Sequence, residues 1–457
     1  MRTLSLLPFF LMACGPNNPL TDDTDGAIPA DPASFGTLSA TLSEAIPAVV
    51  VVNFEVEGGA GEPWVRFGPA DEDTRYQTTA DEQDDGSWQA ILVGCPAQTI
   101  CSYAPGRGEA QGDSGEIATG TAPDWVEIQG EPTGDQSAGF LLTTVMSSER
   151  AALILDLQGR LVWWYPVPDL DGGGLTTRAS LAPDGRSVWF NQFDLGSSEP
   201  VDQRQARLVQ VALDGSWHEI LTIPDTHHDF HLSDDGSVVW LGLEEREVEG
   251  EPLQGDRLVR RDATGEEEVL WSGWDSFTYD PESQRNSPPG YWTLANHLEQ
   301  DSAVGDDAWA IGFKNLDTII GIDGVSGDER WRLGKEEPAI DPDTPFAGQH
   351  GFTLLDDSIL LFDNQGAPGV SRVLELTLDT SATSSDTLWE HDNGSRTLIL
   401  GDVLRTESGR TMIAWGEAGI IEEIAVDGTI VTDIRFTRDE FIPPIGFLEY
   451  QESIGPR

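Results

Sequence analysis

Two kinds of turn alternate along most of the chain, and their repetition restricts the fold more than any other feature of the sequence. Turns of the first kind precede a run of apolar β residues and lie at 181–185, 232–236, 355–357 and 407–409. Turns of the second kind, most often Asp-x-x-Gly or Asp-Gly, lie at 156–159, 213–215, 262–265, 324–327 and 426–428, with a weaker example at 378–380. Each alternation supplies four strands in about fifty residues, which is the repeat of a β-propeller blade.

The number of these repeats predicts the fold class. Six turns of the second kind predict a six-bladed β-propeller over residues 126–457, in which the first and last strands close the ring together. No stretch shows sustained helical periodicity, so we expect an all-β chain. Parallel β-helices have shorter repeats, and that fold is disfavoured.

A separate domain is expected ahead of the propeller. Between residues 36 and 121, short β-type runs at 48–56, 64–67 and 88–93 are separated by turn residues. Several such runs within about ninety residues are typical of a small immunoglobulin- or fibronectin-like β-sandwich. Residues 118–124 are expected to link the two domains.

The first residues have the pattern of an export signal. Arg2 precedes a short apolar run at 4–13, which is too short to span a bilayer. The sequence Leu-Met-Ala-Cys ending at Cys14 resembles the processing site of bacterial lipoproteins, which implies removal of residues 1–13 and acylation of Cys14; a conventional signal peptide with a chance cysteine is the alternative. Residues 14–35 are polar and would form a flexible tether. We therefore expect an exported protein held in the bacterial envelope by its lipid anchor alone, at the periplasmic face or the outer membrane.

The other two cysteines are Cys95 and Cys101. An exported compartment is oxidising, so a disulfide that closes this small loop is the expected state. A metal site is disfavoured because further ligands are missing nearby.

The charge balance excludes some partners. The chain has 80 acidic and 26 basic residues, for a net charge of −54. Such a surface repels nucleic acid and anionic lipid headgroups, so neither is an expected partner. Any site for an anion must carry its own local positive groups.

Histidines recur in three consecutive repeats of the predicted propeller. His228 and His350 each lie seven residues before the equivalent turn aspartates, Asp235 and Asp357, so their side chains should have the same orientation. His297 lies in the corresponding segment of the repeat between them, and His227 and His231 flank His228. We interpret the histidines as a shared chemical site on the channel; buried structural histidines and a metal cluster are the alternatives.

A cation accompanies these imidazoles. Lys314, one of only two lysines in the chain, falls within 310–315, the predicted strand after the His297 segment. A lysine beside histidines favours binding of an oxyanion and keeps a neighbouring histidine neutral and nucleophilic. A solvated lysine on a blade edge is the alternative.

Several motifs in this region match one known family. The matching segments are 227–229 (His-His-Asp), 313–323, 330–334, 349–352 (Gln-His-Gly-Phe), 359–364 and 371–372. Together they resemble the arylsulfate sulfotransferases, and the resemblance spans most of the propeller, from about residue 140 to the end. That family also carries a small N-terminal β-sandwich.

The resemblance implies a reaction and a set of site residues. The family moves a sulfuryl group from a phenolic sulfate ester to a phenolic acceptor through a sulfohistidine, without a nucleotide donor or other cofactor. By motif, the nucleophile falls on His350. His228 (or its neighbour His227) and His297 would bind the sulfuryl oxygens or act as general acid and base. The expected substrate-binding residues are Lys314, Asn315, His227 and His231.

Two positions depart from the family pattern. Glu299 stands where an asparagine is typical, and a carboxylate there would repel a sulfate. Lys314 stands where an arginine is typical, which keeps the charge but loses the bidentate fork. The alternative function is a non-catalytic binding or scaffold propeller on the cell surface. A quinone-dependent dehydrogenase is disfavoured because eight blades with tryptophan-docking repeats would be expected.

Overall fold

The computed structural model describes residues 32–133, 138–147, 149–168, 174–195, 199–281, 290–305, 307–365, 369–438 and 442–456. The expected signal peptide, Cys14 and nearly all of the tether lie outside the described residues. Helix is scarce in those residues, and its elements include α1 (Gly273–Ser276) and the 3-10 turns η1 (Val201–Gln203) and η3 (Gly416–Ala418). None of these helices is long and apolar enough to cross a bilayer.

The N-terminal part of the chain forms two antiparallel sheets. The first has the order β1–β2–β6–β5, with bounds Ser34–Leu42, Val50–Glu57, Trp88–Leu92 and Asp81–Glu82. The second has the order β4–β3–β7–β8, with β9 also against β7, and bounds Tyr76–Thr79, Pro63–Pro69, Ile100–Arg107, Ala110–Gln111 and Gly115–Ala118. In β2 buried residues alternate with more exposed ones, as expected of a strand with one face on a core.

The predicted disulfide joins Cys95 to Cys101. Both cysteines are fully buried in the core that the two N-terminal sheets share. The bridge fixes the loop between β6 and β7, and the prediction is confirmed.

The rest of the described chain forms six larger antiparallel sheets and one short parallel pair. The first sheet has the order β36–β11–β12–β13, with bounds Glu449–Gln451, Phe140–Met146, Arg150–Asp156 and Leu161–Pro166. The second is β14 to β17, with bounds Ala179–Leu181, Ser187–Gln192, Arg207–Ala212 and His218–Thr222. The third is β18 to β21, with bounds Thr226–Leu232, Val238–Val248, Glu251–Arg261 and Glu267–Ser272. The fourth is β22 to β25, with bounds Ala295–Gln300, Ala308–Phe313, Thr318–Asp323 and Glu329–Gly334.

The last two sheets complete the series. The fifth has the order β27–β28–β29–β31, with bounds Phe352–Leu354, Ser358–Asp363, Arg372–Thr377 and Thr387–His391. The sixth has the order β32–β33–β34–β35–β10, with bounds Asp402–Arg405, Thr411–Trp415, Ile420–Ile424, Ile430–Thr437 and Glu127–Pro132. The parallel pair is β26 (Asp341–Pro342) with β30 (Ser384–Ser385).

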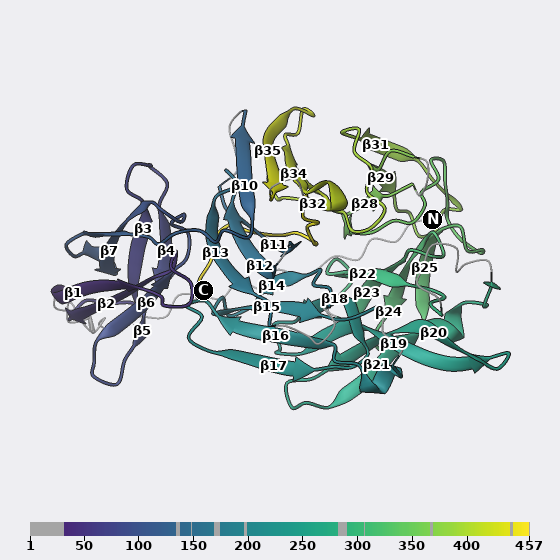
Figure 1. Ribbon diagram of the computed structural model, residues 1–457, viewed down its shortest axis with the longest axis horizontal. Helices are drawn as coiled ribbons and strands as arrows, with labels where there is room; N and C mark the ends of the chain where they lie inside the picture. Colours follow the sequence, from purple (N-terminus) through teal and green to yellow (C-terminus); the bar gives the residue numbers. More distant parts are fainter. Residues whose placement is uncertain are drawn as a thin grey trace, which may run out of the picture.

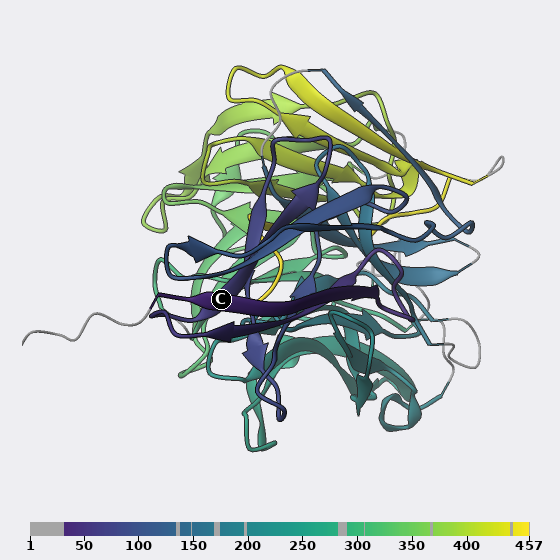
Figure 2. The ribbon, with the colours of Figure 1, turned by 90° about the vertical axis from the view of Figure 1, so that its left-hand side faces the viewer.

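These sheets follow one another around a centre, and the two ends of the series meet. Figure 1 shows the order of colours around the molecule, with the early strand β10 beside the late strand β35. The C-terminal strand β36 in turn pairs with β11. Figure 2 shows the N-terminal sheets on one side of this ring. The chain is therefore an all-β protein with a β-propeller, and the fold class expected from the repeats is confirmed at this level.

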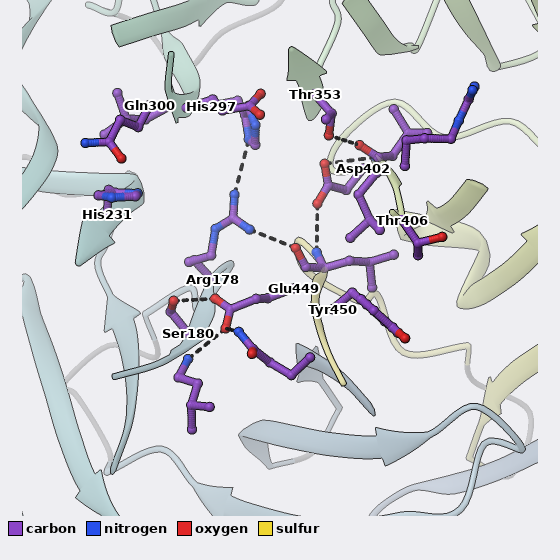
Figure 3. A pocket seen from close by; sticks show the side chains of 18 of the residues that line it. Arg178, Ser180, His231, His297, Gln300, Thr353, Asp402, Thr406, Glu449 and Tyr450 are labelled. Carbon is purple, nitrogen blue, oxygen red and sulfur yellow. Dashed lines mark hydrogen bonds between the residues drawn. The ribbon is translucent and has the colours of Figure 1, made fainter. Parts of the chain in front are cut away.

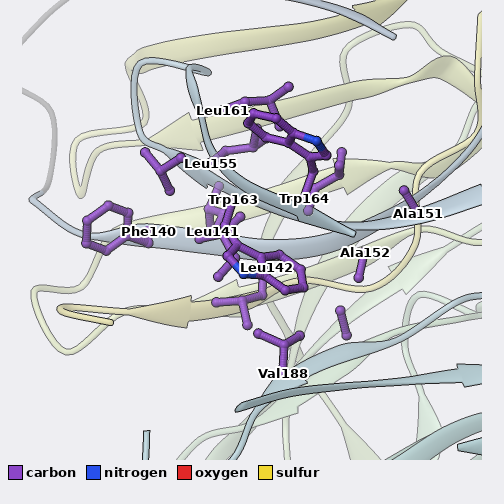
Figure 4. Packing of buried hydrophobic residues seen from close by; sticks show 14 of the residues in the cluster. Phe140, Leu141, Leu142, Ala151, Ala152, Leu155, Leu161, Trp163, Trp164 and Val188 are labelled. Atoms are coloured by element: carbon purple, nitrogen blue, oxygen red, sulfur yellow. The ribbon is translucent and has the colours of Figure 1, made fainter. Parts of the chain in front are cut away.

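The largest apolar core joins the N-terminal sheets to the propeller. Ile46 and Val93 pack in one cluster with Leu142 and Trp163 of the first propeller sheet. Figure 4 shows how Trp163, Leu142 and their neighbours fill the space between strands. The indole N–H of Trp163 donates to the carbonyl of Leu213 at 2.8 Å, so the polar edge of this buried ring has a partner.

Acidic side chains connect the inner strands, by which we mean β14, β18, β22, β27, β32 and β36, the first strand of each propeller sheet. In four places a carboxylate accepts a backbone N–H of the neighbouring repeat. The pairs are Asp229 with Leu298 at 2.9 Å, Glu299 with Leu354 at 2.9 Å, Asp402 with Leu448 at 2.7 Å and Glu449 with Leu181 at 3.0 Å. These bonds satisfy amides that the sheet ladders do not reach and fix the inner strands relative to one another.

Candidate functional site

The pairing of the inner strands determines which histidines are equivalent. The last paired residues of β18, β22 and β27 are Leu232, Gln300 and Leu354. The residues four places earlier are His228, Asn296 and His350. His228 and His350 thus occupy the same position in their repeats, as the spacing to the turns predicts. His297 lies one residue further along its strand, and Asn296 takes the equivalent position.

His350 is held in one tautomer by Asn364, the residue that follows β28. Its ring is 3% exposed, and Nδ1 lies 2.7 Å from Oδ1 of Asn364. The amide nitrogen of Asn364 donates to the carbonyls of Thr397 and Leu400, at 2.7 and 3.0 Å, so Oδ1 is the atom that faces the ring and it can only accept. The proton is therefore on Nδ1, and Nε2 carries the lone pair. Burial, with the charge of Lys314 as second cause, lowers the pKa of His350 to about 3, so the ring is neutral at neutral pH.

His228 has a similar electrostatic setting on a strained backbone. Its φ of 45° lies in the left-handed region, at a bulge in β18. Non-glycine residues are uncommon there and cluster at functional sites. Burial lowers the pKa of His228 well below its ordinary value, and the charges of His227, His350 and Lys314 add to the effect. His350 thus affects His228, and Lys314 affects both.

His227 connects His228 to a buried carboxylate. Nδ1 of His227 lies 2.9 Å from Nδ1 of His228, and Nε2 lies 3.1 Å from Oδ1 of Asp256. Asp256 belongs to β20 and is 1% exposed. The three side chains form a chain that runs from the third strand of the sheet to its inner strand.

Lys314 brings a positive charge to the two histidines. It follows β23, and burial lowers the pKa of its ammonium group while the carboxylate of Glu417 opposes this shift. Its backbone N–H donates to the carbonyl of Leu294 at 3.0 Å, which fixes the chain at this point. A cation beside two neutral imidazoles is the local positive group that an anion site requires in a chain of net charge −54.

His297 has partners at both ring nitrogens. Nδ1 lies 3.1 Å from Oδ2 of Asp229, and Nε2 lies 2.9 Å from the carbonyl oxygen of Phe352. Arg178 binds both oxygens of the same Asp229 at 2.8 and 3.0 Å and packs over the ring of Phe447 at 4.8 Å. These residues form a buried polar layer, and Figure 3 shows Arg178 and His297 facing each other within it. His297 can therefore orient its neighbours, but both of its ring nitrogens already contact protein groups and are not free to bind a substrate.

The charges in this layer reinforce one another. Burial by itself would raise the pKa of Asp229, yet the charge of Arg178 and the hydrogen bond with His297 lower it below its ordinary value. Burial would lower the pKa of Arg178, and Asp229 raises it instead. Arg178 and Asp229 therefore form a buried ion pair with hydrogen bonds on both sides.

A cavity lies where the inner strands end, and Arg178 and His297 of this layer are part of its lining. It has a volume of about 880 Å³, and the residues that line it do not include His228, Lys314 or His350. His231, Glu299, Asp402 and Glu449 line this cavity together with Arg178 (Figure 3). The structure therefore separates the expected residues into two groups.

His231 and Glu299 both belong to this cavity. The ring of His231 packs edge-on against Trp309 with a centroid distance of 5.2 Å, and burial lowers the pKa of His231. Glu299 accepts the N–H of Leu354, and burial raises the pKa of Glu299 well above its ordinary value. Burial thus favours the uncharged acid, which weakens the repulsion expected between Glu299 and a sulfate.

The remaining expected ligand, Asn315, has a local partner. Its amide nitrogen donates to the carbonyl of Trp292 at 3.0 Å and so ties Asn315 to the segment before β22. Among the described residues, no group of three or more histidine, cysteine, aspartate or glutamate side chains has the arrangement of a metal site.

Sequence reasoning missed four residues of this region. They are Arg178, Asp256, Asn296 and Asn364. Asn364 lies within a segment that matches the family pattern, directly after the strand β28, so this match was a usable signal. The partners of Arg178 and Asp256 are distant in the sequence, at 51 residues for Arg178 and Asp229, and no local pattern indicates them.

Comparison with known proteins finds distant structural similarities only. No family model and no curated protein matches the sequence. Among solved structures, the chain is similar to a protein of unknown function from Bacteroides caccae, with 13% identity, a TM-score of 0.43, and 68% of this chain and 99% of that chain covered. It is similar to the nidogen/laminin complex, with 10% identity, a TM-score of 0.42, and coverage of 68% and 97%. It is also similar to virginiamycin B lyase from Staphylococcus aureus, with 14% identity, a TM-score of 0.37, and coverage of 68% and 99%. These similarities are too distant to bear on chemistry.

Proposed function

We propose that this protein transfers a sulfuryl group from a phenolic sulfate ester to a phenolic acceptor, as the arylsulfate sulfotransferases that its motifs resemble do. The observation that carries the proposal is the hydrogen bond between His350 Nδ1 and Asn364, at 2.7 Å, which leaves the lone pair on Nε2. A neutral imidazole with a fixed tautomer is a nucleophile available at neutral pH. Lys314 supplies the positive charge that a sulfate needs, and no cofactor enters the reaction.

The reaction has two steps. In the first, Nε2 of His350 attacks the sulfur, the bond from sulfur to the aryl oxygen breaks, and the electron pair leaves on the phenolate. In the second, the hydroxyl oxygen of the acceptor attacks the same sulfur, the N–S bond breaks, and its electron pair returns to Nε2. The hydroxyl proton passes to a base, for which His228 is our candidate because burial and the nearby positive charge keep its ring neutral, with one nitrogen free to accept a proton. Positioning and charge stabilisation dominate such transfers, as they do for phosphoryl groups.

Labelling of the protein tests this proposal directly. Incubation with 4-nitrophenyl sulfate in the absence of acceptor should add one SO₃ group to the peptide that contains His350 and release an equivalent amount of nitrophenolate. The His350→Gln variant should show neither, whereas the variant of an exposed histidine, His218→Gln, should behave as the wild type. Wild-type protein that stays unlabelled, or a label on another residue, would contradict the proposal.

The same resemblance and the sequence features at the N-terminus underlie our proposals for the architecture and the location of the protein. We propose that the six propeller sheets are six blades and that the two N-terminal sheets form an immunoglobulin- or fibronectin-like sandwich. We also propose that the chain is exported and anchored in the bacterial envelope through acylated Cys14, with small aryl sulfates and phenols as partners and no nucleic acid. Incorporation of labelled palmitate into the wild type but not into a Cys14→Ala variant would support the anchor.

A binding propeller is the second candidate function, and the position of the cavity favours it. The cavity of about 880 Å³ opens where the inner strands end, away from His350. A protein that uses this cavity to bind a ligand would need no nucleophile. It would keep full ligand binding in the His350→Gln variant and would release no phenol from any sulfate ester.

A further inference from the structure

A buried chain of three side chains ends at the proposed general base. Asp256 on β20, His227 on β18 and His228 on β18 are connected by contacts of 3.1 Å and 2.9 Å. Their exposed fractions are 1%, 1% and 7%, so water does not compete for these contacts. A buried carboxylate next to two buried imidazoles is costly unless their protons are ordered so that each donor faces an acceptor.

The carboxylate of Asp256 fixes the direction of the hydrogen bonds. Its Oδ2 accepts the backbone N–H of Ala295 at 2.6 Å and the hydroxyl of Thr293. Its Oδ1 lies 3.1 Å from Nε2 of His227 at an angle unsuited to a hydrogen bond, and neither of these two atoms has a hydrogen-bond partner among the described residues, so each is the nearest polar group available to the other. An aspartate that receives these donors can only accept, so Nε2 of His227 carries the proton.

The remaining protons are then determined. With its proton on Nε2, neutral His227 has the lone pair on Nδ1, which faces Nδ1 of His228. The short contact between these two nitrogens requires one proton, and it must come from His228. His228 is thus left with its lone pair on Nε2, the nitrogen that a base would use.

We propose that His227 and Asp256 are positioning residues that make His228 the base of the second transfer step and hold the proton that it collects. This inference rests on the proposed function. As the acceptor hydroxyl loses its proton to Nε2 of His228, the proton on Nδ1 of His228 moves to Nδ1 of His227. His228 is neutral again, and the positive charge is on His227 beside the carboxylate of Asp256. The charge is thereby kept away from Lys314, and the proton returns by the reverse path when a phenolate leaves.

The substitution Asp256→Asn should reverse the direction in which protons are donated along Asp256, His227 and His228. The hydroxyl of Thr293 and the N–H of Ala295 still need an acceptor, so the amide oxygen takes the place of Oδ2 and the amide nitrogen faces His227. An N–H donor at that point requires the lone pair on Nε2 of His227 and its proton on Nδ1. His228 then carries its proton on Nε2 and cannot accept another there. A second variant, His227→Phe, removes the relay while leaving Asp256 in place.

Nitrogen NMR of protein with labelled histidine tests the proton positions without any substrate. In the wild type we expect His228 to be protonated on Nδ1 and not on Nε2, with the opposite pattern in Asp256→Asn; the signal of His228 is assigned with His228→Gln. A wild-type His228 protonated on Nε2 would overturn the proposal. This measurement is independent of sulfuryl transfer, so a failure of the proposed function leaves it interpretable.

Kinetics separate the two transfer steps. Nitrophenolate is a good leaving group and needs no proton, so Asp256→Asn and His227→Phe should still label His350 and release one equivalent. Turnover with a phenol acceptor should fall by roughly a hundredfold or more, the usual contribution of a general base. Glu268→Gln, at an exposed side chain on the same sheet, should leave both steps unchanged. Full turnover in both relay variants would show that the relay has no role, and loss of labelling together with turnover would show a merely structural one.

Discussion

The burial of His350 should make the stability of the propeller depend on pH in a way that one substitution can isolate. The ordinary pKa of a histidine is 6.5, and burial lowers that of folded His350 to about 3. Between these two values the unfolded chain binds a proton at this residue and the folded protein does not. Stability therefore increases with pH in this window, is complete above pH 6.5, and is lost progressively as the pH falls towards 3.

The size of the effect follows from the two pKa values. Between pH 7 and pH 5, the unfolded histidine gains most of its proton while the folded one stays neutral, which costs about 2 kcal/mol of unfolding free energy. The result is insensitive to the folded pKa, because a value one unit higher changes the loss by only about 0.1 kcal/mol. Other buried groups titrate in the same range, so the difference between wild type and variant is the informative quantity.

Urea denaturation followed by tryptophan fluorescence measures this difference. The His350→Gln variant should lose about 2 kcal/mol less stability than the wild type between pH 7 and pH 5, whatever its stability at pH 7. The surface variant His218→Gln should follow the wild type. An equal pH dependence in wild type and His350→Gln would refute the reasoning, because it would mean that folded His350 accepts a proton as readily as the unfolded residue does.

Further predictions concern the groups around the site. Arg178→Leu should destabilise the protein by about 3 to 5 kcal/mol in urea denaturation, because it leaves the fully buried Asp229 without its partner, whereas the double variant Arg178→Leu with Asp229→Leu should recover part of this loss. Gly351→Ala should cost about 1 to 3 kcal/mol in the same measurement, because an added Cβ would lie 1.8 Å from a carboxylate oxygen of Asp402 and 2.8 Å from its Cα. An unchanged denaturation midpoint would show that β32 can shift to make room for the added Cβ. The double variant Cys95→Ala with Cys101→Ala should lose about 2 kcal/mol in thermal unfolding, and addition of a reductant to the wild type should have the same effect.

The fold class could be predicted from the sequence because turns have residue patterns that are recognisable without any long-range contact. A turn that needs a positive φ selects glycine, and Gly185, Gly236 and Gly409 all have φ between 68° and 81° at equivalent hairpins. Strands follow such turns at regular intervals, so the sheets could be counted without knowledge of any long-range contact. The residues that close the ring needed no separate signal, because a chain of repeats leaves its first and last strands as partners.

The site residues could be predicted from the sequence only where they keep a constant sequence separation from a turn. His228 and His350 meet this condition, and the structure gives them the same position. His297 does not, because it lies one residue nearer to the end of its strand than His228 and His350 do, and the turn after Gln300 is longer. Asn296 consequently stands in the position where a third histidine was expected. Partners such as Asp256 were not predictable, since their contact with His227 depends on which strands become neighbours.

Carboxyl groups near the axis of the propeller have a different role from the carboxylates on its surface. Net charge alone suggests that carboxylates near the channel would repel a sulfate, and Glu299 was the obvious example. In the structure Asp229, Glu299 and Asp402 accept backbone N–H groups of the next repeat. Asp229 is also neutralised by Arg178, while burial raises the pKa of both Glu299 and Asp402 and favours their uncharged forms. The carboxyl groups of the inner strands thus serve as hydrogen-bond acceptors that hold the propeller together, and the charge of Lys314 can act on His228 and His350 with little opposition from them.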